Sequence, residues 1–315
     1  MFGRIAALRR AGVVGLNKRN ADYTLRYNPR SRYPLVDDKL ITKRLALEAG
    51  LAVPDLYHVI EHEGDLTRLP QRMRELDDFV VKPAHGSTGD GIVVITGRKR
   101  DSFRTAGGSL VSEPELLHHI TNALAGLYSL GGHPDSVFLE QRVISDPAFD
   151  EVAWEGVPDV RIVVLLGVPV MAMIRLPTRR SHGKANLHQG AIGVGIDMAS
   201  GITLRAVYGE TIVEEHPDTG HPIVGLSIPQ WPRLLEIAAQ SFEITGLGYQ
   251  AVDLVLDRRY GPMILELNAR PGLAIQIANR AGLQPRLSLV EANVAALADR
   301  AARIEFARAH FGVHP

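Results

Sequence analysis

Three residues in the last quarter of the chain have the oxygen-bearing side chains that magnesium prefers. Glu266 and Asn268 are two residues apart in a strand-like segment, so both side chains leave the same sheet face. Asp253, in the preceding apolar segment, can face the same space across a hairpin. A polar, solvent-facing strand is the alternative, but apolar residues flank each acid, and a carboxylate buried without a cation is costly. The residues therefore predict a site for Mg²⁺, in which two ions can share Glu266.

A glycine-rich segment after a short apolar strand can hold phosphate. Three glycines within the loop let the backbone approach a ligand, and their N–H groups can surround an anion. Lys82 precedes them on the strand as a point charge for a phosphate, so the loop is not a Walker loop. A glycine-rich hairpin turn is the alternative. The candidate phosphate-binding residues of the loop are His85, Gly86, Ser87, Thr88, Gly89 and Gly91.

Two further segments are candidates for nucleotide contacts. Lys39 follows Asp38 at a predicted helix start, where a capped helix with a solvated lysine is the alternative. A second segment, Glu140, Gln141, Arg142 and Val143, leaves a predicted strand. Its backbone can hydrogen-bond an adenine edge, although a simple strand end is the alternative.

Arginines and a basic loop are candidates for substrate contacts. Arg161 and Arg175 lie on two predicted neighbouring strands, and arginine matches carboxylates and phosphates bidentately. Either arginine can instead form a surface ion pair. The following residues 177–190 predict a mobile basic loop that contains Lys184, Asn186 and His188.

The expected elements mix strands and helices without a regular βαβ alternation, which favours an α+β fold. Residues 1–36 predict a short helix followed by an extended arm, and residues 98–112 an irregular basic insertion. The expected helices cover about residues 38–49, 65–76, 113–128, 231–245 and 288–310. The expected strands cover about residues 56–60, 79–82, 92–95, 136–142, 160–166, 169–176, 250–256 and 263–268.

Composition excludes several classes of function. The 315 residues include 35 basic and 35 acidic side chains, so no global field directs the chain to nucleic acid or an anionic membrane. No cysteine is present, which removes disulfides, thiolate zinc sites and a cysteine nucleophile. No apolar run approaches the about 20 residues that span a bilayer. These features predict a cytoplasmic enzyme that acts on small anions, with no nucleic-acid partner and no membrane insertion.

The order of these motifs resembles the ATP-grasp superfamily, and more narrowly the RimK-like α-L-glutamate ligases and their related proteins. The resemblance covers about residues 37–280, and its most specific part is the segment Leu265-Glu266-Leu267-Asn268 with Pro271-Gly272. It implies that Lys39, Lys82 and the glycine loop hold ATP phosphates, and that Glu140 to Val143 meet the adenine. It also implies that Asp253, Glu266 and Asn268 bind two Mg²⁺ ions, for which Mn²⁺ can substitute.

The resemblance further implies a reaction. The γ-phosphoryl group of ATP passes to a carboxylate, and an amine then displaces phosphate from the acyl phosphate. The catalytic candidates are Arg161, Arg175, Lys184, Asn186, His188 and Arg270. Arg270 stands where RimK-like sequences have a small residue, so it either binds an extra acidic group or pairs with a carboxylate.

The predicted fold is an ATP-grasp fold in which two α+β subdomains grip ATP behind a much reduced N-terminal domain. The predicted parts are an arm at 1–36, a smaller subdomain at about 37–145, a larger one at about 146–285 and a C-terminal helix at 286–315. The predicted function is ligation of an amino acid such as glutamate to an amine of a small molecule, peptide or protein. The alternatives are a small-molecule kinase and a silent nucleotide-binding protein, and the arm leaves a homo-oligomer open.

Overall fold

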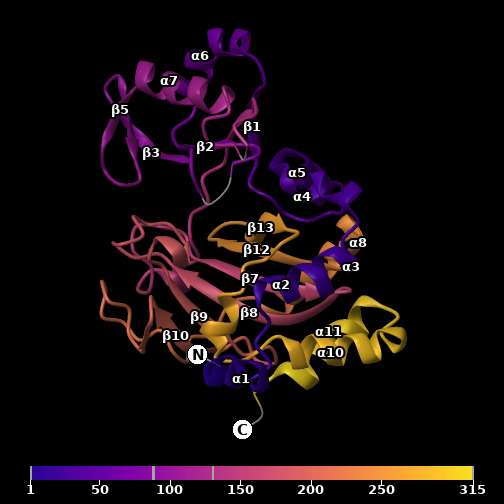
Figure 1. Cartoon of the computed structure of the whole chain (residues 1–315). Coiled ribbons are helices and arrows are strands. Elements are labelled where there is room, and N and C mark those ends of the chain that lie inside the picture. The colour runs from indigo at the N-terminus through magenta and orange to yellow at the C-terminus, as the bar shows by residue number, and fades with distance from the viewer. Residues whose placement is uncertain (1, 87–88, 130, 314–315) are drawn as a thin grey trace.

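The chain folds into two lobes, each built on an antiparallel sheet (Figure 1). The computed structural model describes residues 2–86, 89–129 and 131–313, and the side chains from Ala6 onward. Both sheets are entirely antiparallel and are joined with helices in an α+β arrangement, which confirms the predicted fold class.

The smaller lobe contains a six-stranded sheet in the order β1-β6-β2-β3-β4-β5. Its strands are β1 (Leu56–Ile60), β2 (Phe79–Pro83), β3 (Val93–Lys99), β4 (Ser102–Thr105), β5 (Leu110–Ser112) and β6 (Val137–Glu140). Helices α6 (Leu69–Arg74) and α7 (Glu113–Leu124) accompany this sheet. Ser112 begins α7 with a capping box, because its hydroxyl accepts from the Glu115 N–H while the Glu115 carboxylate accepts from the Ser112 N–H. Leu116 and Ile120 of α7 then pack with Phe79 and Phe103 in the core of this lobe.

The larger lobe contains a seven-stranded sheet in the order β11-β10-β9-β8-β7-β12-β13. Its strands are β7 (Asp159–Leu165), β8 (Val168–Leu176), β9 (Ile192–Ile196), β10 (Thr203–Tyr208), β11 (Thr211–Val213), β12 (Tyr249–Asp257) and β13 (Gly261–Asn268). Its helices are α8 (Trp231–Thr245), α9 (Ile275–Asn279), α10 (Gln284–Asn293) and α11 (Arg300–Phe311). The strands β9, β10 and β11 were missing from the predicted elements.

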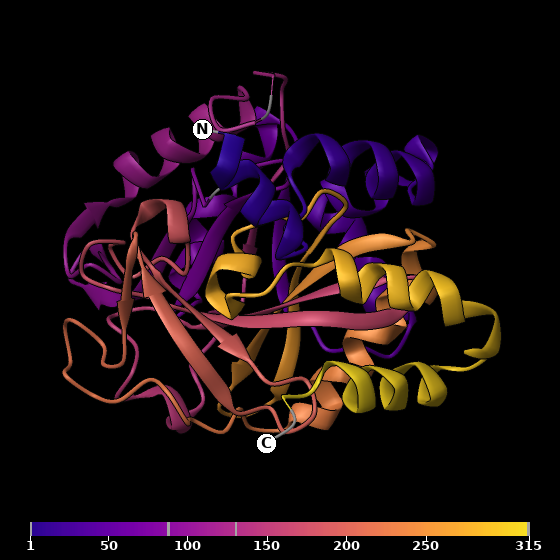
Figure 2. The same cartoon turned by 60° about the horizontal axis from the view of Figure 1, so that its bottom comes forward.

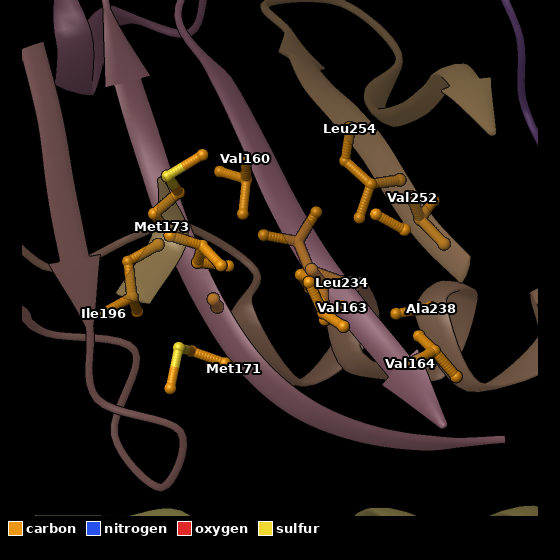
Figure 3. Packing of buried hydrophobic residues seen from close by; sticks show 14 of the residues in the cluster. Val160, Val163, Val164, Met171, Met173, Ile196, Leu234, Ala238, Val252 and Leu254 are labelled. Atoms are coloured by element: carbon orange, nitrogen blue, oxygen red, sulfur yellow. The ribbon is translucent and has the colours of Figure 1, made fainter. Parts of the chain in front are cut away.

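Strand alternation gives the larger sheet one apolar and one charged face near its middle. Figure 3 shows Val160, Val252 and Leu254 in one packed cluster with Leu234 and Ala238 of α8. On each strand, the side chains that alternate with these apolar residues point to the opposite face of the sheet, because side chains alternate along a strand. The apolar face therefore anchors α8, and the other face is left for polar side chains.

The N-terminal segment packs on the larger lobe of its own chain (Figure 1). Its elements are α1 (Phe2–Arg10), α2 (Leu16–Lys18), a π-helical turn (Arg19–Thr24), α3 (Leu25–Tyr27), a 3-10 turn (Arg30–Arg32) and α4 (Pro34–Asp37). The Asn28 side chain donates to the carbonyl oxygens of Tyr249 and Ala269 and accepts from the Tyr249 N–H. The prediction of an extended arm is wrong, because most of this segment is helical.

Two other predictions about elements need correction. Residues 98–112 are not irregular, since they continue β3 and form β4 and β5 at the sheet edge. The single C-terminal helix predicted at 288–310 is two helices, α10 and α11, joined by a turn beside the larger sheet (Figure 2). Asp299 begins α11 by accepting from the Ala302 N–H, which is why a new helix starts there.

Among the residues that the structure describes, no helix is long and apolar enough to cross a membrane. The chain continues from α4 into α5 (Lys39–Glu48), which lies next to β13 and so connects the two lobes.

Candidate active site

Strand register gathers the charged residues of the larger sheet on one face. Asp253 of β12 lies opposite Glu266 of β13 on one side and opposite Arg161 of β7 on the other. Asp159 of β7 lies opposite Arg175 of β8. Directly opposed residues share a sheet face, as do residues two apart on one strand. The four strands therefore present one connected charged surface.

The arginines and aspartates of this surface form a continuous ion-pair network. Arg161 donates to both oxygens of Asp253, from Nε to Oδ1 at 2.7 Å and from Nη2 to Oδ2 at 2.6 Å. Arg175 pairs with both oxygens of Asp159 and donates from Nη2 to Asp253 Oδ2 at 2.9 Å. Asn268 Nδ2 also donates to Asp253 Oδ2, at 3.2 Å. Asp253 is thus the centre of the network.

Within this network, the pKa values of the two aspartates shift in opposite directions. Burial acts to raise the pKa of Asp253, but the two arginines outweigh it and lower the pKa to about 2. Burial raises the pKa of Asp159 to about 6, because its one bonded arginine is shared with Asp253 and the Asp253 charge adds to the increase. Arg175 stays charged, since the two carboxylates raise its pKa against the effect of burial.

Glu266 differs from the aspartates because no hydrogen bond joins its carboxylate to another described side chain. Burial raises its pKa, and Lys39 and the two arginines only partly oppose this effect. On this face Asp159, Asp253 and Glu266 outnumber Arg161 and Arg175. A half-buried, unbonded carboxylate within a net-negative surface fits a divalent cation.

The predicted metal ligands would form an incomplete coordination shell by themselves. Asp253, Glu266 and Asn268 supply two carboxylates and one amide on the same face. Within the described part of the chain, no group of three or more His, Cys, Asp and Glu side chains could hold a metal ion. The donor set fits Mg²⁺ only with water and phosphate oxygens as additional ligands.

The smaller lobe places lysines around one buried acid. Lys82 of β2 and Lys43 of α5 both contact Glu140 at the end of β6, with Lys43 Nζ 2.8 Å from Oε2. Burial acts to raise the pKa of Glu140, but the two ammonium groups outweigh it and lower the pKa. Glu140 is therefore a structural counter-charge for lysines, and its side chain is occupied rather than free for an adenine.

Lys39 links this cluster to the charged sheet face. It is the first residue of α5, where the Asp38 carboxylate accepts from the Leu40 N–H at 2.8 Å. Its Nζ donates to the carbonyl oxygens of Gly86 and Ala84 in the glycine loop. Burial lowers the Lys39 pKa, and the charge of Glu266 is the largest effect that opposes this. A small cavity between the lobes is bordered by Lys39, Lys82 and Leu265, among others.

The glycine loop is fixed at its start by a buried aspartate that the sequence did not indicate. Asp135 accepts from the His85 N–H at 3.0 Å and from Ser129 Oγ at 2.6 Å, and lies 2.7 Å from His85 Nδ1. The second ring nitrogen of His85 lies 3.7 Å from Asp38 Oδ2. His85 thus lies between the loop and the start of α5, with one ring nitrogen bonded to Asp135.

The loop backbone requires glycine at its end. Gly91 has a φ of 76° in the left-handed region, and a Cβ atom there would lie 2.6 Å from the Tyr128 ring. Gly89 is close to the Lys184 side chain of the larger lobe, so the two predicted loops meet. Ser87 and Thr88 lie outside the described residues.

The segment after Glu140 packs as a connection between the lobes. The Gln141 N–H donates to the Asp55 carbonyl at 2.8 Å, and Arg142 pairs with Asp78 at 2.7 Å. Val143 packs with Val255 and Met263 of the larger sheet. The Gln141 N–H and the Arg142 side chain are therefore engaged within the protein, while Val143 contributes an apolar wall.

The loop at residues 177–190, which was predicted to be mobile, is held in place at its base. The side chains of Thr178 and Ser181 are fully buried, and the Thr178 hydroxyl donates to the Gly190 carbonyl at 2.7 Å. The Asn186 side chain accepts from the His188 N–H at 3.0 Å and starts a short 3-10 turn. Lys184 and His188 are exposed. The prediction of a mobile loop therefore does not fit its base at 178–183.

Comparison with known proteins identifies the family of this chain. A family model described as "Sugar-transfer associated ATP-grasp" matches residues 18–292, which is most of the chain. The chain belongs to this ATP-grasp family. The narrower resemblance to RimK-like ligases is not shown by these comparisons and stays a prediction. A search of curated proteins found no match.

Several solved structures are similar to this ATP-grasp chain at low identity. The ATP-grasp ligase PsnB, in complex with a minimal precursor, is 16% identical over 85% of this chain and 63% of its own, with a TM-score of 0.45. The D-cycloserine synthetase DcsG is 16% identical over 86% of this chain and 73% of its own, with a TM-score of 0.47. The D-alanine–D-alanine ligase from Bacillus anthracis is 12% identical over 89% of this chain and 67% of its own, with a TM-score of 0.43. The chain thus spans less than two thirds of the PsnB chain.

Arg270 of this ATP-grasp chain fits one of its two predicted alternatives, and Lys43 was not predicted. Arg270 lies with its Nη2 3.6 Å from Asp37 Oδ2 and its guanidinium over the Tyr33 ring. It therefore pairs with a carboxylate, one of the two predicted alternatives. Lys43 was missed, although its spacing of four residues from Lys39 places both lysines on one helix face.

Proposed function

We propose that this ATP-grasp chain is an ATP- and Mg²⁺-dependent carboxylate–amine ligase. The observation that carries the proposal is the meeting of two opposite charge surfaces. Lys39 and Lys82 come from the smaller-lobe side, and Glu266 with Asp253 comes from the larger sheet. A magnesium–polyphosphate complex needs both surfaces, one for phosphate oxygens and one for the metal.

Each surface has a proposed role. Lys39, Lys82 and the loop from His85 to Gly91 would hold the phosphates of ATP. The connection from Glu140 to Val143, with Leu265, would border the adenine, although the Gln141 N–H already has an internal partner. Because Glu140 is held by Lys43 and Lys82, its proposed contribution is to orient these lysines.

Asp253, Glu266 and Asn268 are the proposed ligands of the metal. Bound Mg²⁺ would neutralise charge on the phosphates and orient them for transfer. A cation at Asp253 would compete with Arg161, which contacts both carboxylate oxygens. Exchange of this contact would release the guanidinium towards the reacting groups.

The proposed reaction has two steps. A carboxylate oxygen of the first substrate attacks the γ-phosphorus of ATP, the bond to the β-phosphate oxygen breaks, and ADP leaves. An amine then attacks the acyl-phosphate carbon, a proton is lost from nitrogen, and inorganic phosphate leaves. Arg161 and Arg175 would stabilise the charge on the transferring group, and Lys184, Asn186 and His188 would border the substrates.

The substrates and the domain limits are also proposals. Glutamate is the first amino acid to test because the RimK-like resemblance implies it. The sugar-transfer association of the family adds amino sugars to the acceptor panel, beside peptides and protein termini. The proposed parts are a largely helical N-terminal segment at 1–36, subdomains at about 37–145 and 146–285, and a C-terminal region at 286–315.

The test is release of ADP and phosphate from ATP and Mg²⁺ with each amino acid and each amine, followed by mass spectrometry. Ligation predicts substrate-dependent phosphate release and a product equal to two substrates minus water. A product that retains phosphate would instead establish the kinase alternative. Tight ATP binding with no ADP from any substrate pair would favour the silent nucleotide-binding alternative.

A further inference from the structure

Two neighbouring arginines at the base of the 177–190 loop are held by aromatic rings instead of carboxylates. The guanidinium of Arg179 lies 4.4 Å from the centre of the Trp154 ring. The guanidinium of Arg180 lies 5.9 Å from the centre of the Tyr208 ring, and its aliphatic stem packs against Gly190. Both side chains are exposed. Stacking orients a guanidinium and leaves its N–H donors available.

Several other arginines of the chain contact a carboxylate instead. Arg142 contacts Asp78, Arg258 contacts Asp150, and Arg300 contacts Glu243. In the described structure, no carboxylate lies within ion-pair distance of the Arg179 or Arg180 side chain. The adjacent guanidinium groups of Arg179 and Arg180 therefore have hydrogen-bonding capacity that no described carboxylate uses. The net charge of the whole chain is zero.

The backbone holds these arginines in place. The Arg179 N–H donates to Asp218 Oδ2 at 2.7 Å. Thr178 before the pair and Ser181 after it are fully buried and bonded to each other, with the Thr178 N–H donating to Ser181 Oγ at 2.9 Å. The two side chains thus project from a rigid turn, which lowers the entropy lost when they bind a ligand.

The pair is close to the proposed reaction centre. Arg175 of the ion-pair network is four residues before Arg179, so their Cα atoms are at most about 14 Å apart along an extended chain. Lys184 of the same loop reaches Gly89 of the glycine loop. A substrate that extends from the reaction centre by up to about 14 Å can therefore reach this pair.

We infer that Arg179 and Arg180 form a docking site for an acidic group, a carboxylate or a phosphate, on the amine acceptor. This inference rests on the proposed ligase function and specifies its acceptor class. Guanidinium forks bind carboxylates and phosphates bidentately, so both sources of negative charge fit the site. A neutral amine lacks the group that these arginines recognise.

The test uses the fluorescence of Trp154, which lies beneath Arg179. The chain has two tryptophans, and Trp231 is buried with its Nε1 bonded to the Met198 carbonyl at 3.1 Å. The full chain is titrated with tri-glutamate as a carboxylate source and glucosamine 6-phosphate as a phosphate source. Tri-serine and glucosamine are the neutral counterparts. Trp154→Phe identifies the part of the signal that comes from Trp154.

The decisive variants are Arg179→Gln with Arg180→Gln, and the matched control Lys99→Gln with Arg100→Gln. The control removes the same charge from two exposed basic residues on the smaller lobe. We expect saturable binding of at least one acidic probe, weakened about tenfold or more in the first variant and unchanged in the control. The probe that binds tells carboxylate from phosphate.

Three results would overturn the inference: equal binding of the neutral probes, an unaffected Arg179→Gln/Arg180→Gln variant, or equal weakening in the control. The binding titration needs no turnover. Acidic probes that bind through the arginines while no substrate pair releases ADP would leave the docking site standing and reject the ligase. Ligation of neutral amines with an unchanged KM in the variant would do the reverse.

Discussion

The smaller lobe and the larger sheet both bury clusters of charge, but with opposite balance. In the lining of the small cavity beside Glu140, the lysines Lys39, Lys43 and Lys82 outnumber the acid. On the sheet face, three carboxylates outnumber two arginines. Burying either excess is costly unless an opposite charge arrives. The two clusters are therefore suited to different halves of one ligand, phosphate on one side and metal on the other.

The two clusters also differ in the kind of contact that holds their carboxylates. Arginines with planar, bidentate contacts fix the aspartates of the sheet, whereas lysines contact Glu140 as point charges. Glu266 is the exception on the sheet, because it has no bonded partner among the described side chains. This difference indicates where a ligand can enter without breaking a bond, and it can be tested residue by residue.

The largest expected effect comes from Glu266→Gln, which keeps the shape of the side chain and removes its charge. We expect turnover to fall by at least about 10³-fold, roughly 4 kcal/mol, since the metal loses its unpaired ligand. The measurement is phosphate release at saturating ATP and Mg²⁺. The exposed Glu243→Gln is the control for a lost surface carboxylate. Near-normal turnover in Glu266→Gln would remove the metal assignment.

The next effect concerns folding rather than turnover. Glu140→Gln leaves Lys43 and Lys82 buried without their counter-charge, so we expect the free energy of unfolding to fall by about 3 kcal/mol. Urea unfolding without nucleotide measures this change. Lys43→Met is the matched comparison, because Glu140 then keeps Lys82, and its cost should be clearly smaller. Equal costs would mean that the cluster has no shared counter-charge.

The sequence predicts the charged sheet face better than the lysine cluster, for a physical reason. Strand periodicity alone places Glu266 and Asn268 together, and an antiparallel hairpin brings Asp253 opposite Glu266. Asp135 is different, because nothing local relates it to His85, fifty residues earlier in the chain. Such contacts depend on how the turn after α7 packs against the glycine loop.

Two errors in the predicted elements arise because composition was used where long-range contacts decide the structure. The edge strands β4 and β5 are only four and three residues long, and the turns beside them contain Arg100, Gly107 and Gly108, so the whole segment resembled an irregular insertion. The base of the 177–190 loop has basic, polar residues, but Thr178 and Ser181 bond each other out of contact with water. Composition describes what such a segment can expose, not which of its hydroxyls become buried.

A smaller effect should appear in the pH dependence of stability without Mg²⁺ or nucleotide. The folded pKa of Asp159 is raised to about 6, so the folded state binds its proton more tightly than the unfolded state. Its contribution is therefore present below about pH 4 and is lost as the pH rises to about 6. Asp253, with a lowered pKa of about 2, acts oppositely and loses its contribution only as the pH falls below about 4.

The measurement is urea unfolding of the wild-type chain and Asp159→Asn at several pH values between 4 and 7. The difference between the two profiles should change by about 1–3 kcal/mol across this range. Arg100→Gln serves as a control for a distant charge change and should run parallel to the wild type. A constant difference between Asp159→Asn and wild type would mean that the pKa of Asp159 is the same in the folded and unfolded states, which would reject the raised pKa.

The smallest expected effect comes from removing the Arg270 side chain. This change tells whether Arg270 binds an acidic substrate group or only pairs with a carboxylate of the protein. Its ion pair with Asp37 joins two half-exposed side chains at 3.6 Å, a kind of contact that contributes about 0–1 kcal/mol. If the pair is its main role, Asp37→Asn should lower the free energy of unfolding by about 0–1 kcal/mol, and Arg270→Ala by slightly more because it also removes the contact with the Tyr33 ring. Both variants should leave each substrate KM within about twofold. A rise in one substrate KM of about tenfold in Arg270→Ala but not in Asp37→Asn would instead show that the guanidinium binds an acidic substrate group, because only that variant removes it. The positive surface near the reaction centre would then extend beyond the lysines, across to the segment that follows Asn268.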